Sequence, residues 1–265
     1  MPALTQTLRE EYKNLFDTCV IRPERKNEIE TILSRLLDNR SRYEAVSDQV
    51  DVPWYIIGVI HSLEASQSFK KHLHNGDPLT ARTVQVPKNR PTSGAPPFTW
   101  EDSAMDALTF DGFDRVEDWS LPGALFNLER FNGFGSRNKG INTPYLWSFS
   151  NHYTKGKFVH DGVFEPNAVS NQCGAAILLR RLVDNDAIEI PPAIGPSTKE
   201  EIIAAGADVP FSNQKSVKAT RLQKLLNRFP GISTQLVPDG SPGNKTSAAF
   251  KEVTGNFLAG DPRAV

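Results

Sequence analysis

The chain has 265 residues, of which 38% are hydrophobic and 23% are charged, and its formal net charge is −1. These values are typical of a globular protein with a sizeable core and exclude an intrinsically disordered chain. No stretch approaches the roughly 18 consecutive apolar residues that a membrane-spanning helix needs, so we expect no membrane insertion.

The first fifty residues predict three helices. Apolar side chains recur three and four positions apart over residues 5–21 and 24–38, with Arg22-Pro23 between the two segments. A third helix is expected over residues 40–47. The N-terminal residues lack the basic segment and apolar core of a secretory signal. We therefore expect synthesis in the cytoplasm, and a target outside it would require another route of release.

The segment PWYIIGVIHSLEAS, which begins at Pro53, predicts a helix that is apolar on nearly every side until Glu64. Proline suits the first turn of a helix, where its missing N–H would have no partner. A helix that is apolar all round is a central, buried one, so a carboxyl group at its C-terminal end is unusual. The plain interpretation is a helix-end glutamate that reaches solvent or pairs with an arginine. The alternative is a general acid, because apolar surroundings disfavour the charged form and raise the pKa of a carboxylic acid.

Residues 70–97 lose the helical periodicity. The turn signals Asn75-Gly76 and Asp77-Pro78 precede the β-prone segment TARTVQV, which predicts a loop with a small β-hairpin or an extended flap. Such a loop can fold back over the end of the Glu64 helix. Asp77 would then be a candidate general base that activates water, although Asp in this setting is equally typical of a plain turn.

Other polar side chains of the same loop are candidates for substrate binding. Thr80 and Thr83 have hydroxyl groups that can orient a water molecule, and Arg82 can hold a carboxylate or a sugar substituent. These residue types also occur in ordinary loops.

A metal site is the rival interpretation of this region. His61, Glu64, His72, His74 and Asp77 all belong to residue types that bind metals. Their spacing matches no zincin pattern, because HSLEA has one histidine where H-E-x-x-H requires two. We therefore predict no metal and no cofactor, and expect the histidines to line a cleft or to hydrogen-bond the flap.

The middle of the chain predicts four more helices, over residues 99–108, 121–131, 145–153 and 172–182. Thr99 is expected to cap the first of them. The two cysteines, Cys19 and Cys173, have no metal-ligand spacing and are interpreted as small core residues. Tyr145, Trp147, Phe149 and Tyr153 cannot all face inward from one helix, so some are expected to reach a groove.

Three segments, taken in order, resemble one family. PWYIIGVIHSLEASQSF resembles the helix of goose-type lysozymes and soluble lytic transglycosylases that ends in the catalytic glutamate. LERFNGFG, over residues 128–135, is similar to that family's Tyr-Asn-Ala-Gly segment, and residues 143–153 resemble its later groove-lining stretch. HLHNGDPLTARTVQVP and PPFTWEDSAMDAL resemble a bacterial and phage-type lysozyme-like group often found with wall-binding modules.

This resemblance implies a mainly α, lysozyme-like domain in which Glu64 is the acid and Asn132, Gly133 and Tyr145 contact the sugar near the cleavage point. The sequence departs from the family at Phe131, where a tyrosine is usual, and at Gly133, where an alanine is usual. It also lacks the Gly-Leu-Met-Gln segment that typically follows the catalytic glutamate. Lytic transglycosylases use a single acid, whereas an aspartate facing that acid would favour hydrolysis.

The C-terminal part predicts a second, small module. Residues 184–213 are expected to be a linker with one short helix, and residues 214–229 an amphipathic helix. Residues 214–265 resemble a three-helix peptidoglycan-binding fold, with a tight turn at 239–243 and a helix that begins near Asn244 or Thr246. Residues 213–265 contain eight Lys and Arg against three Asp and Glu, a net charge of +5. Such an excess suggests an anionic partner but is also common on a solvated surface.

The sequence therefore predicts a lysozyme-like glycoside hydrolase of two parts, a catalytic domain over residues 1–183 and a wall-binding module over 214–265. It would act as a monomer on β-1,4 bonds of peptidoglycan in the cell wall, or on a related extracellular polysaccharide, and would not bind nucleic acid. The alternatives are a chitosanase or chitinase, a lytic transglycosylase, a non-catalytic wall-binding protein and a metal-dependent hydrolase.

Overall fold

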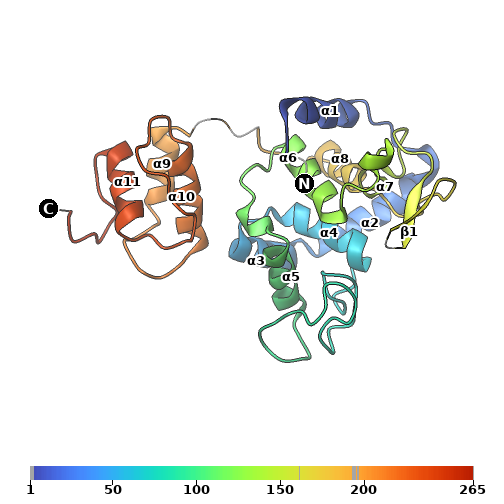
Figure 1. The fold of residues 1–265 in the computed structure, drawn as a ribbon, viewed down its shortest axis with the longest axis horizontal. Helices are drawn as coiled ribbons and strands as arrows, with labels where there is room; N and C mark the ends of the chain where they lie inside the picture. Colours follow the sequence, from blue (N-terminus) through green and yellow to red (C-terminus); the bar gives the residue numbers. More distant parts are fainter. Residues whose placement is uncertain (1–2, 161, 193–194, 196, 265) are drawn as a thin grey trace. The chain divides into compact units, whose positions relative to one another are not determined.

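Residues 3–160, 162–192, 195 and 197–264 are described by the computed structural model, and they form a mainly helical protein with one small sheet (Figure 1). The chain divides into two units, Met1–Ala193 and Ile194–Val265. The helices are, in chain order, α1 (Gln6–Asp17), α2 (Lys26–Asp38), α3 (Arg40–Val50), α4 (Trp54–Ala65), α5 (Trp100–Phe110), α6 (Leu121–Asn132), α7 (Pro144–Trp147), α8 (Ala175–Asp184), α9 (Lys199–Gly206), α10 (Val217–Arg228) and α11 (Asn244–Thr254).

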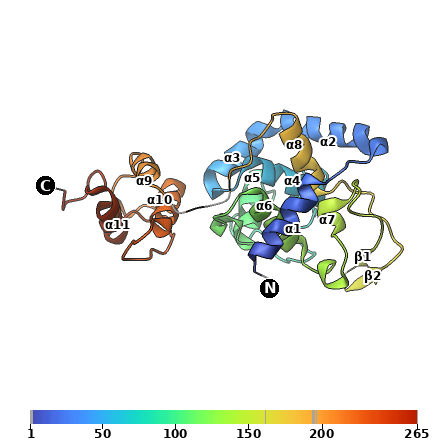
Figure 2. The ribbon, with the colours of Figure 1, turned by 90° about the horizontal axis from the view of Figure 1, so that it is seen from above.

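Helix α4 lies at the centre of the first unit, where α2, α3 and α8 pack around it (Figures 1 and 2). Its apolar composition accounts for this place, because Ile56, Ile57 and Ile60 are fully buried. Gly58 allows α2 to approach closely, since a Cβ there would lie 3.0 Å from Cγ of Leu36. The predicted central helix is therefore confirmed.

Helix α1 packs against α6 through a buried polar cluster. The Tyr12 hydroxyl donates to Oε2 of Glu129 over 2.6 Å, and Arg137 donates to both oxygens of the same carboxylate over 2.8 and 3.0 Å. Glu129 is 1% exposed, so its charge requires these partners. The cluster fixes the middle of α6 in the unit.

Two predicted helices have different bounds in the structure. Residues 5–21 form a helix only as far as Asp17. The helix predicted over 145–153 is wrong beyond Trp147, because α7 has four residues and Phe149 takes a positive φ of 72°. A left-handed residue cannot continue a right-handed helix.

Of the two alternatives expected within residues 70–97, the structure shows a loop and not the hairpin. The two-stranded antiparallel sheet pairs β1 (Lys157–His160) with β2 (Val163–Glu165) instead. TARTVQV lies in an irregular loop, where Val84 is 70% exposed. The amides of Val84 and Gln85 bond to the Asp77 side chain, and the backbone of Thr83 bonds to that of Asn89 and Arg90 within the same loop, so no partner strand is needed.

The second unit contains α9, α10 and α11, which pack on one another. Ile202 of α9 is fully buried with Leu222 and Leu226 of α10. Helix α9 is the short helix expected within the linker 184–213. In the structure it belongs to the core of the second unit. Helix α11 begins at Asn244, as expected, and its N-cap residue is Gly243, which makes no side-chain hydrogen bond.

Within the described ranges, no helix has the length and hydrophobicity needed to cross a membrane. The two cysteines are free thiols: Cys173 is buried and Cys19 is half-buried.

Candidate active site

Glu64 occupies the last turn of α4, just before the helix ends. Ser66 and Gln67 both take left-handed backbone conformations, with φ of 50° and 61°, which turn the chain away from the helix axis. The side chain of Gln67 donates to the carbonyl of Ile32 over 2.9 Å, and the backbone N–H of Gln67 donates to the carbonyl of His61. The end of the helix is therefore held by its neighbours, and the position of Glu64 is fixed with it.

The carboxyl group of Glu64 has one side-chain partner, Tyr145. The Tyr145 hydroxyl donates to Oε1 of Glu64 over 3.0 Å, and no salt bridge to Glu64 exists among the residues that the structure describes. Burial raises the pKa of Glu64 to about 7, the hydrogen bond from Tyr145 lowers it, and the charge of Asp111 raises it. The interpretation of Glu64 as one half of a surface ion pair does not fit this setting.

Tyr145 reaches Glu64 from the short helix α7. The Thr143 side chain caps that helix by accepting from the amide of Tyr145 over 3.3 Å. Tyr145 itself is 7% exposed. Burial raises the pKa of Tyr145 well above its ordinary value, and the charges of Glu64 and Asp111 raise it further, so its hydroxyl stays protonated and is a hydrogen-bond donor.

Asn132 and Gly133 lie at the C-terminal end of α6. Asn132 is exposed, and Gly133 takes a φ of 86° with open space where a Cβ would be. The adjacent Phe131 ring lies 6.5 Å from the ring of Tyr145. Asn132 and Gly133 therefore lie at the same end of α6 as Phe131, the residue that neighbours Tyr145.

Asp77 is held by its own loop. Its Oδ2 accepts from the amides of Val84 and Gln85 over 2.8 and 3.0 Å, and its Oδ1 accepts from the Gln85 side chain over 3.2 Å. Burial acts to raise the pKa of Asp77, but these hydrogen bonds outweigh it and keep the pKa below the ordinary value. The preceding Gly76 brings the turn onto the end of α4, since a Cβ there would lie 3.0 Å from the Glu64 carbonyl oxygen.

Thr83 and Arg82 also bond within the loop. The Thr83 hydroxyl, 1% exposed, donates to the carbonyl of Pro87 and accepts from the amide of Arg90. Arg82 donates to the carbonyl of Gly94 over 2.7 Å. The contacts of three predicted site residues, Asp77, Arg82 and Thr83, therefore organise the loop itself. Among the described residues, no hydrogen bond or ion pair joins any of the three to Glu64.

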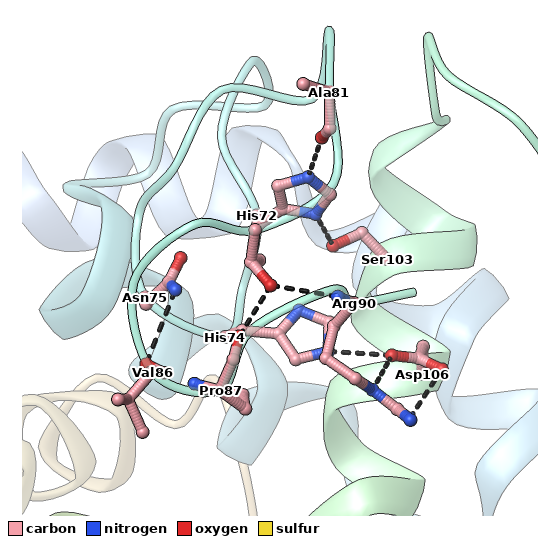
Figure 3. Close-up of polar contacts among 10 residues, drawn as sticks. His72, His74, Asn75, Ala81, Val86, Pro87, Arg90, Ser103 and Asp106 are labelled. Carbon is pink, nitrogen blue, oxygen red and sulfur yellow. Dashed lines mark hydrogen bonds and ion pairs between the residues drawn. The ribbon is translucent and has the colours of Figure 1, made fainter. Parts of the chain in front are cut away.

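The histidines fasten this loop to α5 (Figure 3). His72 lies between Ser103 and the carbonyl of Ala81, at 2.7 and 2.8 Å. His74 and Arg90 converge on the carboxylate of Asp106, with His74 Nε2 at 2.8 Å and Arg90 Nη2 at 2.7 Å.

The remaining histidine of the metal hypothesis, His61, is buried in the core. Its Nδ1 lies 3.0 Å from the Tyr43 hydroxyl, and burial lowers its pKa to about 4. In the described part of the chain no three His, Cys, Asp or Glu side chains gather in an arrangement that could hold a metal ion.

Asp111 is the site residue that sequence reasoning missed. It follows the last residue of α5, and its charge raises the pKa of both Glu64 and Tyr145. In the sequence it stands in TFDGF, which predicts only a turn. Its effect on the pKa of Glu64 depends on how segments far apart in the chain pack together, which a local pattern does not show.

Comparison of the chain with family models, with curated proteins and with solved structures gave no match. The case for a function rests on the geometry of the site and on its chemistry. The arrangement provides a carboxylic acid that holds its proton near neutral pH, next to a phenol that can hydrogen-bond the carboxylate left behind.

Proposed function

We propose that the protein is a lysozyme-like glycoside hydrolase that cleaves β-1,4 bonds of peptidoglycan, with Glu64 as the general acid. The observation that carries the proposal is the environment of the Glu64 carboxyl group, which raises its pKa to about 7. An acid whose pKa is near the working pH is half protonated and transfers its proton efficiently. Glycosidic cleavage requires such an acid, because the leaving oxygen must be protonated as the bond breaks.

Tyr145 supports the second half of that step. When the proton moves from Glu64 to the glycosidic oxygen, Glu64 becomes a carboxylate in surroundings that disfavour charge. The hydroxyl of Tyr145, 3.0 Å from Oε1, then donates a charge-assisted hydrogen bond, which is stronger than the bond to the neutral acid. Burial thus favours the proton before the reaction, and Tyr145 stabilises the carboxylate during it.

The charge of the second unit supports an anionic polymer as substrate. The second unit, residues 194–265, contains nine Lys and Arg against six Asp and Glu, a net charge of +3, and the excess lies in residues 213–265, whose net charge is +5. Peptidoglycan carries carboxylates on its stem peptides, whereas chitosan is cationic and would be repelled. The net charge of −4 over residues 1–193 favours chitosan instead, so the chitosanase alternative has its own supporting observation.

The contacts of Asp77 favour a second candidate reaction. Its two oxygens accept three hydrogen bonds from the 84–85 segment, and this supports a site with a single acid. In that case Glu64 would protonate the leaving oxygen as the glycosidic bond breaks. Its carboxylate would then take the proton of the muramic acid C6 hydroxyl as that oxygen bonds to C1, and the product would be a 1,6-anhydro sugar. Asp77 as the water-activating base stays a prediction.

Mass spectrometry of digests of purified peptidoglycan and of chitosan oligomers tests the proposal. We expect muropeptides from peptidoglycan, with reducing ends for hydrolysis or anhydro ends for transglycosylation, and none with Glu64→Gln. Glu117→Gln, an exposed position of the same unit, is the matched control and should give the wild-type products. Unchanged products from Glu64→Gln would refute the proposal, and cleavage of chitosan alone would refute the substrate.

A further inference from the structure

We infer that residues 70–97 are held to α5 by a pH-sensitive latch, which consists of His74, Arg90 and Asp106. The latch is closed while His74 is neutral, and it opens when His74 takes up a second proton. This inference concerns the regulation of the loop and goes beyond the proposed role of Glu64. It applies whether or not Glu64 is an acid catalyst, and its test uses no substrate.

The latch joins the loop to α5 through one carboxylate, as Figure 3 shows. Arg90 donates from Nε to Oδ2 of Asp106 over 2.8 Å and from Nη2 to Oδ1 over 2.7 Å. Nε2 of His74 lies 2.8 Å from the same Oδ2. The negative charge of Asp106 is therefore already matched by the positive charge of Arg90, and His74 is a third group at the same carboxylate.

These contacts fix the protonation state of the His74 ring. A carboxylate only accepts hydrogen bonds, so Nε2 carries the hydrogen atom and Nδ1 is the bare nitrogen of a neutral ring. The His74 side chain is 0% exposed, and among the described residues its Nδ1 has no hydrogen-bond partner. A second proton would therefore create a buried, charged N–H group with nothing to accept its hydrogen bond.

The groups that face His74 agree with this geometry. Burial is the largest effect on its pKa and lowers it, whereas the hydrogen bond and the charge of Asp106 from α5 raise it. His72 and Arg90, both from the loop, lower it, and the ring of His72 lies 5.8 Å from that of His74. The pKa of His74 therefore lies below its ordinary value, and the closed latch binds fewer protons than a released loop.

Proton uptake consequently favours the open latch. In a released loop the His74 ring would be in water, where the ordinary pKa of histidine is about 6.5. Well above that pH the ring is neutral in both states, so the equilibrium between closed and open does not depend on pH. As the pH falls through that value, the released state gains protons first, and its population rises by no more than about tenfold for each pH unit.

The loop that the latch holds covers the end of the central helix. A Cβ at Gly76 would lie 3.0 Å from the carbonyl oxygen of Glu64, so the turn at residues 75–78 lies directly on the last turn of α4. A released loop would leave that end of α4 open to water. The latch thus links the pH of the surroundings to the cover of the residue that is proposed as the acid.

The test is amide hydrogen exchange of the full chain, expressed as protection factors, which remove the intrinsic pH dependence of exchange. Between pH 7.5 and pH 5.5 the amides of His72, Val84 and Gln85, which bond to Asp77, should lose protection severalfold and at most about tenfold. His74→Gln keeps a neutral donor for Asp106 at every pH, so this loss should disappear. His160→Gln, at an exposed position of β1, is the matched control and should retain the loss.

Equal protection at both pH values in the wild type, or an undiminished loss in folded His74→Gln, would overturn the inference. An equal loss at Ile60 of α4 would also overturn it, because that would indicate unfolding of the whole unit. If His74→Gln fails to fold, ¹⁵N NMR of the wild-type imidazoles decides: His74 must gain its second proton over the pH range in which the loop loses protection. A charged His74 in a protected loop would contradict the latch. Neither readout needs activity, so activity retained in Glu64→Gln would refute the proposed function alone.

Discussion

The hydroxyl of Tyr145 donates a hydrogen bond to Oε1 of Glu64 over 3.0 Å, and the two residues stand 81 positions apart in the chain. The bond joins the end of the central helix α4 to the short helix α7. The hydrogen bond lowers the pKa of Glu64, whereas burial raises it, and the pKa that results from these opposed effects is about 7. An acid adjusted in this way can both hold and release a proton at neutral pH.

Tyr145→Phe should raise the pKa of Glu64, because it removes the hydrogen bond that favours the carboxylate. The alkaline limb of the kcat/KM profile, which follows the deprotonation of Glu64, should move to higher pH. The rate should fall about tenfold or more, since a hydrogen bond to a charged group contributes roughly 1.5–3 kcal/mol. Rates of glycan cleavage measured between pH 5 and 9 would check both effects. A lower rate with an unmoved alkaline limb would contradict this role of Tyr145.

Glu64→Gln should stabilise the folded protein at alkaline pH. The pKa of Glu64 is raised to about 7 in the folded state, so the folded chain binds more protons than the unfolded chain as pH rises. Stability is therefore lost between the unfolded pKa of roughly 4 and the folded value, and the loss is at most about 4 kcal/mol. Urea unfolding at pH 4 and pH 8 should show a gain for Glu64→Gln only at pH 8. A gain of equal size at both values would exclude this cause, and Glu117→Gln should show none.

Asp106→Asn should loosen the loop between α4 and α5. The carboxylate of Asp106 accepts from His74 and twice from Arg90, so its removal leaves largely buried donors without their charged partner. A loss of about 2–4 kcal/mol in the free energy of unfolding is expected. Hydrogen exchange should become faster for amides of residues 70–97. Asp102→Asn, exposed on the same helix, is the control and should leave that exchange unchanged. Unchanged exchange in Asp106→Asn would show that the contacts of Asp106 with His74 and Arg90 do not hold the loop.

Asp77→Asn separates a structural role of Asp77 from a catalytic one. The amides of Val84 and Gln85 bond to its carboxylate, so their protection from exchange should fall. If the site uses a single acid, cleavage should continue with the same reducing-to-anhydro product ratio as in the wild type. Loss of hydrolysis with unchanged amide protection would restore Asp77 as the base.

The central helix and the carboxyl group at its C-terminal end could be predicted because both depend on local sequence. Nearly continuous apolar residues up to Glu64 fix a buried helix wherever the rest of the chain goes. The effect of Asp111 on the pKa of Glu64 could not be predicted in the same way, since it depends on the tertiary packing of the unit. An Asp-Gly pair in sequence indicates a turn and carries no information about what packs against it.

Some secondary-structure predictions were wrong because they depend on contacts that the propensity of each residue for helix or strand does not describe. TARTVQV has the composition of a strand, but Asp77 and Thr83 bond the backbone of their own loop and leave no role for a partner strand. The helix predicted over 145–153 stops at Trp147 because Ser148 is extended and Phe149 is left-handed, and neither residue type predicts this. The short helix expected within residues 184–213 is α9, but its packing in the second core could not be predicted, because one short helix does not show what its apolar residues contact.

The most direct test of the account is the rate at which purified Glu64→Gln protein releases soluble fragments from peptidoglycan, compared with wild type at pH 6. The account predicts a fall of about a thousandfold or more, as expected when the essential acid of a glycosidase is removed, with an unfolding transition no lower than that of the wild type. Glu117→Gln should keep the wild-type rate. A folded Glu64→Gln protein that cleaves peptidoglycan at the wild-type rate would contradict the assignment of Glu64 as the acid.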